Sequence, residues 1–134
     1  IMSLIETIPL PNGLELTIHD RSRRIASDTV KVELSFGMKI KVAPSFFASE
    51  DDHLELVGIF GDELTYEHKL ERTFVSEADE SAIRAELLDT FKANSLNYLS
   101  SPDFARKMAL SLLRDIRQNP FKYRRPVPDA DVDD

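Results

Sequence analysis

The sequence contains no cysteine and no tryptophan, and only four of its 134 residues are glycine. Without cysteine, the chain has no disulfide, no thiolate metal ligand and no catalytic thiol. It also lacks the glycine-rich phosphate loops and the common histidine and serine motifs of hydrolases and metalloenzymes. These absences exclude several frequent enzyme classes, and they favour a non-catalytic protein with no cofactor and no metal.

Long apolar runs are missing as well. No stretch approaches the ~20 apolar residues that a membrane helix requires, and the first residues show no basic segment followed by an apolar core, as a signal peptide would. A chain of 134 residues fits one domain with a core of its own. We therefore expect a cytoplasmic protein that has no membrane partner.

Charge of both signs is abundant but unevenly placed. The net charge of −7 argues against nucleic acid as the main partner, because binding to phosphates depends on an excess of positive charge. A local basic patch is nevertheless expected between residues 104 and 125, and the aspartates after residue 126 would screen it. The basic residues of this segment are Arg106, Lys107, Arg114, Arg117, Lys122, Arg124 and Arg125.

The first half of the chain alternates apolar and polar residues, which is typical of strands with one buried face. Residues 3–10 and 14–20 form a predicted hairpin around Asn12-Gly13, with the first strand at an edge because it contains proline. Residues 30–42 predict a very long strand, and we expect a bulge or bend at Gly37 to relieve its length.

A second hairpin is predicted after a polar loop. Residues 54–60 are almost entirely apolar and predict a buried strand, and residues 64–74 alternate and predict its partner. Residues 61–63 would form the tight turn between them.

Helical periodicity replaces alternation from Ser76 onward. One helix is predicted from Ser76 to about residue 93, and a second between residues 101 and 119. The fold class is therefore α+β: an antiparallel sheet of four or five strands with two C-terminal helices packed on one face. Residues 1–120 would form this domain, and residues 121–134 an extended or disordered charged tail.

The stretch 17–25, "TIHDRSRRI", is the most reactive-looking segment of the chain. His19 and Asp20 are adjacent, so on an extended backbone their side chains diverge, and they cannot form a triad with Ser22. We interpret the stretch as a corner between two strands. Its arginines are candidate ligands for phosphate or carboxylate groups. The candidate anion-binding residues are Arg21, Arg23 and Arg24, together with Arg124 and Arg125.

Two further clusters of polar residues are candidate sites. The acidic residues 50–55 lack the alternating pattern of a calcium loop and are interpreted as a hydrated loop. His68 and Arg72 share a predicted sheet face with Tyr66, where an unpaired charge would be costly. Three interpretations are possible. The two residues lie at an end of the sheet that is open to water, a bulge shifts the register, or the residues line a polar ligand pocket.

Three hypotheses for function follow. The first is a non-catalytic binding or regulatory module that acts as a homodimer, because long strands leave edges that a second copy could cover. The second is an anion- or nucleic-acid-binding module that uses the arginine cluster and the basic C-terminal segment. The third is a small enzyme or ligand pocket around His68, Arg72 and Tyr66.

Overall fold

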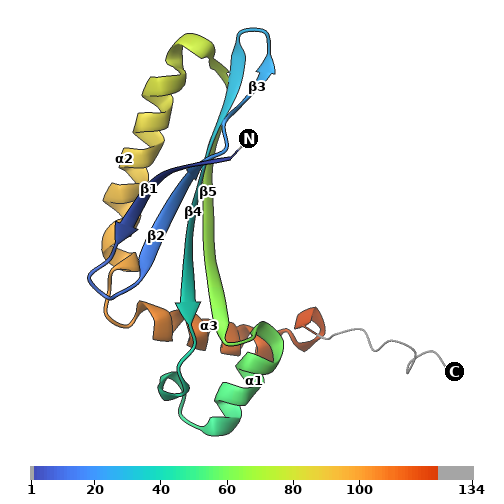
Figure 1. Ribbon diagram of the computed structural model, residues 1–134. Coiled ribbons are helices and arrows are strands. Elements are labelled where there is room, and N and C mark those ends of the chain that lie inside the picture. Colours follow the sequence, from blue (N-terminus) through green and yellow to red (C-terminus); the bar gives the residue numbers. More distant parts are fainter. Residues whose placement is uncertain (1, 124–134) are drawn as a thin grey trace, which may run out of the picture.

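The computed structural model describes residues 2–123, which form a five-stranded antiparallel sheet and three α-helices. The sheet and helix α2 run side by side along the length of the molecule, and helices α1 and α3 lie across one end of the sheet (Figure 1). The predicted α+β class is confirmed, with the antiparallel sheet followed by two C-terminal helices.

The predicted first hairpin is confirmed. Strands β1 (Ser3–Pro9) and β2 (Glu15–Asp20) pair through a turn in which Gly13 has a φ of 91°, a conformation that glycine adopts without strain. The side chain of Asn12 donates hydrogen bonds of 2.8 Å to the carbonyl oxygens of Leu99 and Ser101. The turn is thus fixed to the corner between the last two helices, and β1 lies at the edge of the sheet.

The long strand β4 (Thr29–Lys41) is the centre of the sheet. On one side it pairs with β2 and then with β3 (Arg23–Ala26), and on the other side it pairs with β5 (Glu63–Ser76). The predicted corner lies between β2 and β3, where the backbone N–H of Arg21 donates to the carbonyl of Glu33 at 2.8 Å. Short and long neighbours therefore flank one continuous central strand.

The pairing of β4 is irregular, but not at Gly37, where the sequence predicts a bulge or bend. The pairing of β4 with β5 is continuous from Val32 to Lys41, so the bulge expected at Gly37 is wrong. The register instead shifts between Val30 and Val32, opposite a segment of β5 in which Phe74 has a φ of 57°. The strand stays paired past Gly37 because a neighbour lies on each side of it.

Helix α1 (Glu50–Phe60) replaces the strand predicted over residues 54–60, and that prediction is wrong. The Ser49 side chain accepts a hydrogen bond from the Asp52 N–H, which caps the helix, and three acids in the first turn favour its N-terminus. Gly61 ends the helix with a φ of 81°. The partner of β5 is therefore β4 itself, and α1 connects the two strands.

Both C-terminal helices are present. Helix α2 (Glu80–Leu99) begins after a short 3-10 helix, η2 (Glu77–Asp79), and α3 (Phe104–Gln118) begins close to its predicted start. The expected end of α2 near residue 93 is wrong. The helix continues to Leu99, because that side chain is completely buried in the core.

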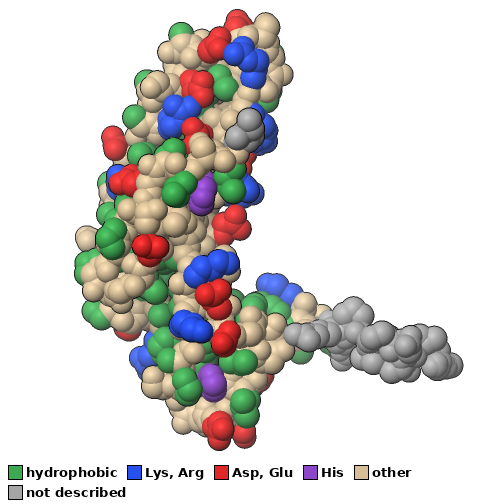
Figure 2. All heavy atoms as spheres, in the orientation of Figure 1, with side chains coloured by type: hydrophobic (Ala, Val, Ile, Leu, Met, Phe, Trp, Pro, Cys, Tyr) green, Lys and Arg blue, Asp and Glu red, His purple; other side chains and the backbone are tan. Residues whose placement is uncertain are grey.

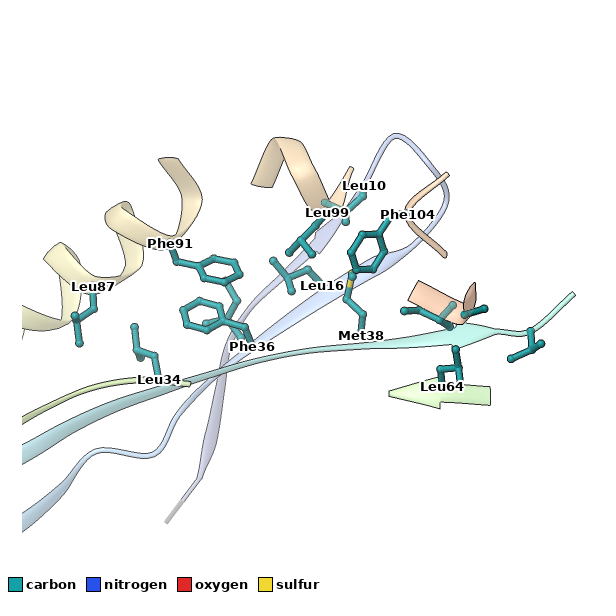
Figure 3. Packing of buried hydrophobic residues seen from close by; sticks show 14 of the residues in the cluster. Leu10, Leu16, Leu34, Phe36, Met38, Leu64, Leu87, Phe91, Leu99 and Phe104 are labelled. Carbon is teal, nitrogen blue, oxygen red and sulfur yellow. The ribbon is translucent and has the colours of Figure 1, made fainter. Parts of the chain in front are cut away.

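The core fills the space between the sheet and the helices (Figure 3). Phe36 of β4 and Phe91 of α2 stack at its centre, with ring centroids 3.7 Å apart and planes 10° apart. Burial of apolar surface of this kind is the main favourable term in folding. The largest fully buried side chains of the core are Leu16, Ile18, Val32, Leu34, Phe36, Ile40, Leu56, Leu64 and Leu99.

The chain leaves α3 through a short 3-10 helix, η3 (Pro120–Tyr123), which packs back on the domain. The Tyr123 ring meets Phe60 edge-on at 5.5 Å, and its hydroxyl donates to the carboxylate of Asp115. Phe121 is exposed. The rest of the predicted tail, including Arg124 and Arg125, lies outside the described residues.

Candidate functional site

The face of the sheet opposite α2 carries the polar side chains. In β4, Val32 and Leu34 point into the core, so Glu33 between them points to the other face. Glu33 is nevertheless buried, because neighbouring charged side chains close over it. A buried carboxylate on an otherwise polar surface marks the place where that surface is hollowed.

The hollow has a volume of about 530 Å³ and is referred to below as the charged hollow. Its wall contains four cationic side chains and two carboxylates. The lining residues are Met2, Arg21, Arg23, Lys31, Glu33, Lys69 and Glu71.

Strand pairing brings these residues together from four segments. Glu33 of β4 lies directly opposite Glu71 of β5, and Lys31 lies opposite Arg23 of β3. Lys69 is two residues from Glu71 and therefore shares its face. Two glutamates in opposite positions repel one another, so this arrangement requires cations between them.

Lys31 and Arg23 supply that positive charge. The Nζ atom of Lys31 is 3.8 Å from Glu33 Oε1 and 3.3 Å from Glu71 Oε1, and Arg23 Nη1 donates to Glu33 Oε1 at 3.0 Å. The side chain of Glu33 is only 8% exposed. The hydrogen bond from Arg23 lowers the pKa of Glu33, and the charges of Arg23, Lys31 and Lys69 act in the same direction against the effect of burial.

Two cations of the charged hollow remain without a carboxylate. Within residues 2–123, neither Arg21 nor Lys69 forms an ion pair. Arg21 Nε is 3.4 Å from the sulfur of Met2, which is a weak acceptor. Four cations against two carboxylates leave an excess of two positive charges. The geometry therefore suits an anion that would lie between Arg21 and Lys69.

The structure divides the predicted anion-binding residues. It brings Arg21 and Arg23 into the charged hollow, but Arg24 turns away and pairs with Glu77 at 2.7 Å and with the Ser27 carbonyl. Arg124 and Arg125 lie outside the described residues. The sequence did place Lys31, Glu33, Lys69 and Glu71 on the polar faces of their strands, but without the register nothing linked them to the arginines.

His19 and Asp20 diverge, as expected for adjacent strand residues. Arg84 of α2 approaches Asp20 with its Nε atom 2.9 Å from Oδ2, so Asp20 faces the helix layer. Its other oxygen accepts from the Ser22 N–H at 2.9 Å and shapes the corner. His19 lies opposite Ser35 on the polar face. The three residues of the reactive-looking stretch therefore form no triad.

The predicted cluster of His68, Arg72 and Tyr66 does not surround one common cavity in residues 2–123. His68 is exposed at the margin of the helix-covered face, with its ring 5.9 Å from Phe91, and Arg72 is 3.9 Å from a carboxylate oxygen of Glu86. Tyr66 instead lines a small cavity of about 200 Å³ with Phe104 and the helix α3. Burial raises the pKa of the Tyr66 phenol. Both side chains are exposed on the edge strand β5 rather than at an open end of the sheet, and Arg72 lies next to the register shift between β4 and β5.

Among the described basic residues of the C-terminal segment, Lys107, Arg117 and Lys122 pair with local acids, whereas Arg106 and Arg114 do not. Arg117 Nη2 donates to Asp52 at 2.6 Å and to Glu55 at 2.9 Å, and Lys122 lies 3.1 Å from Asp115. The acidic residues 50–55, interpreted as a hydrated loop, lie in helix α1 instead, and no group of three metal-ligating side chains gathers within residues 2–123. On the face drawn in Figure 2, acidic and basic side chains are mixed rather than separated. This mixture argues against an extended track for nucleic acid on that face.

No family model, curated protein or solved structure matches the chain. Within residues 2–123, no helix combines the length and apolar character needed to cross a membrane. The charged hollow is therefore the described feature whose chemistry points most directly to a ligand.

Proposed function

We propose that the protein is a non-catalytic binding module whose ligand is a small anion held in the charged hollow. The observation that carries this proposal is the pair of cations, Arg21 and Lys69, which face the hollow without a carboxylate partner in residues 2–123. An anion between them would restore charge balance without displacing any ion pair already present.

The chemistry of the wall favours a phosphate or a dicarboxylate. Arginine presents a planar fork that binds two oxygens of such groups at once, and lysine adds a point charge. Glu71 is half-exposed and is free to accept a hydrogen bond from a ligand hydroxyl. The volume of about 530 Å³ lies in the range of ordinary small-molecule sites. A phosphorylated hydroxy compound would use all of these groups.

Nucleic acid is the less favoured anion. Two carboxylates border the charged hollow and would repel a continuous line of phosphates. The basic side chains of Arg117 and Lys122, in the C-terminal segment, already have acidic partners. A compact anion avoids both difficulties.

Isothermal titration with inorganic phosphate near neutral pH tests this proposal. We expect saturable one-site binding, and we expect Arg21→Gln to lower the affinity about tenfold or more, since a charge-assisted hydrogen bond contributes ~1.5–3 kcal/mol. Lys69→Gln should act in the same direction. Both side chains lie at the surface of the hollow, so thermal melting should show that the variants remain folded.

Arg24→Gln is the matched control. It removes an arginine from the same stretch of sequence, but Arg24 pairs with Glu77 and does not line the charged hollow. Its phosphate affinity should equal that of the wild type. Equal losses in Arg21→Gln and Arg24→Gln would point to general charge attraction and would contradict a specific site.

The second part of the proposal is a homodimer formed through strand β5. This strand has 14 residues and pairs only with β4, so its outer edge faces no other strand in the described part of the chain. The opposite edge strand, β1, is half as long, with seven residues. Long open edges are usually covered in native proteins, and a second copy of β5 would cover this one.

The charges along β5 support self-pairing. In an antiparallel pair with a two-fold axis at His68, Lys69 of each copy lies opposite Glu67 of the other. With the axis at Leu70, Lys69 lies opposite Glu71. Either register therefore forms two reciprocal ion pairs, and opposite charges in facing positions stabilise a sheet. Lys69 would then have a carboxylate partner across the dimer, so Arg21 is the cation of the charged hollow that stays unpaired in the monomer and in the dimer. The lack of cysteine favours the cytoplasm as the compartment in which the dimer works.

A further inference from the structure

A second hollow lies between α3 and the short 3-10 helix η1 (Pro44–Phe46), at the end of the molecule where α1 and α3 cross the sheet. It has a volume of about 600 Å³ and is referred to below as the α3 hollow. It shares no lining residue with the charged hollow. Any ligand in it would therefore bind independently of the proposed anion.

The floor of the α3 hollow is apolar. Phe46 and Phe47 lie next to one another with ring centroids 6.3 Å apart, and both are partly buried against the core. Leu110 and Leu113 of α3 form the other side. Aromatic and aliphatic side chains that line an open hollow offer a surface from which an apolar ligand group would release water.

The rim of the α3 hollow is positively charged. Arg117 is neutralised by Asp52 and Glu55, but the side chains of Arg106 and Arg114 form no ion pair or hydrogen bond within residues 2–123. The two free arginines are exposed, so they keep their charge at low cost.

The spacing of these arginines places an apolar residue between them. Arg106, Leu110 and Arg114 are four residues apart, so they form one row along the same side of α3. The rise of a helix separates the two arginine Cα atoms by ~12 Å. A ligand that lies along this row contacts a positive charge at one end and the apolar side chain of Leu110 along its length.

We propose that the α3 hollow binds a small amphiphilic carboxylate, of the chemical class of a medium-chain fatty acid. The carboxylate would bind to the fork of Arg106 or Arg114, and the hydrocarbon chain would lie on Leu110 and Phe47. A cation does not fit, because Asp52 is the acid that lines the hollow and Arg117 already holds it at 2.6 Å. A purely apolar ligand would leave both arginines without a partner.

Octanoate, kept below its micelle concentration, is the probe that tests this inference. In a two-dimensional NMR titration of the full chain, we expect saturable shifts at Leu110, Arg114 and Phe47. The double variant Arg106→Gln/Arg114→Gln should weaken octanoate binding at least tenfold. Both arginines are exposed, so circular dichroism and the melting temperature should match those of the wild type.

Two controls keep the result specific. Lys107→Gln removes a charge from the same helix, but Lys107 pairs with Asp103 and does not line the α3 hollow, so octanoate affinity should stay unchanged. Octylammonium has the same chain with the opposite charge and should not bind. Equal binding of octylammonium, or undiminished binding of octanoate by the double variant, would overturn the inference. Arg21→Gln should leave octanoate binding intact, which separates this result from the test of the charged hollow.

Discussion

Glu33 places a nearly buried carboxylate between Arg23 and Lys31, and the charged hollow is built around it. Its depressed pKa means that the folded state holds the charged form more tightly than the unfolded chain does. The stabilisation is therefore complete above the ordinary pKa of glutamate, and it is lost as the pH falls through the lower folded value.

Glu33→Gln should reveal this linkage. We expect the variant to be less stable near neutral pH by about 1 kcal/mol, a modest value because Arg23 is half-exposed and water screens the pair. In acid the difference should shrink below the ordinary glutamate pKa, and wild type and variant should converge once the pH is below the lower folded pKa of Glu33. Urea unfolding at a series of pH values measures this difference, and a gap that stays constant into strong acid would contradict the assigned role.

Phe74 is a second residue with a measurable consequence. Its φ of 57° lies in the left-handed region, and its side chain is 81% exposed, so packing does not offset the strain of this conformation. Phe74→Gly should therefore raise the free energy of unfolding by about 1 kcal/mol, less the backbone entropy that glycine adds to the unfolded state.

Phe74→Val is the matched comparison. A β-branched residue tolerates a positive φ less well than phenylalanine, so this variant should lower the melting temperature while Phe74→Gly raises it. If both variants are destabilised by the same amount, the ring of Phe74 contributes contacts that outweigh the strain.

At the scale of the elements, strand β5 carries the proposed dimer. Lys69→Glu would place glutamates opposite one another in either two-fold register, so we expect the dimer dissociation constant to rise about tenfold or more. Sedimentation at micromolar concentration measures this change. Adding Glu67→Lys should restore the dimer if the axis lies at His68, and adding Glu71→Lys should restore it if the axis lies at Leu70.

The dimer test has its own control. Lys39→Glu changes a lysine of β4 that bonds to Thr65, away from the outer edge of β5, and should leave sedimentation unchanged. A wild-type protein that sediments as a monomer at these concentrations would contradict the dimer. Arg21→Gln should leave sedimentation unaffected, which keeps this test apart from anion binding.

The long strand β4 was predictable because a period of two over 13 residues has no other simple explanation. Helix α1 was not predicted, because residues 54–60 are an apolar run that fits a strand and a helix equally well. The signals that decide it are local: Ser49 caps the helix at Asp52, and Gly61 ends it. In the sequence alone, serine and glycine are equally typical of a polar loop and a tight turn.

The candidate site was predictable only in part, because the sequence shows which side chains are polar but not which strands pair. The arginine cluster and the polar face of each strand follow from residue type and alternation. Which arginine meets which lysine depends on the register of β3, β4 and β5, and a shift of one residue exchanges the two faces. Arg24, next to Arg23, lies outside the charged hollow for that reason.

At the scale of the whole molecule, the net charge of −7 hides two local sites of positive excess. The charged hollow lies on the polar face of the sheet. The α3 hollow is lined by α3, at the end of the sheet that α1 and α3 lie across. Their separate linings predict that phosphate and octanoate bind without competing. An acidic protein with two such sites suits small anions better than long polyanions.

The most direct measurement of the central claim is an NMR titration of the full chain with inorganic phosphate. We predict saturable shifts of the backbone amides of Arg21, Ser22 and Glu33, at the corner that borders the charged hollow, with those of α3 unchanged. Shifts that never saturate, or that spread evenly over basic residues throughout the chain, would contradict an anion site in this hollow.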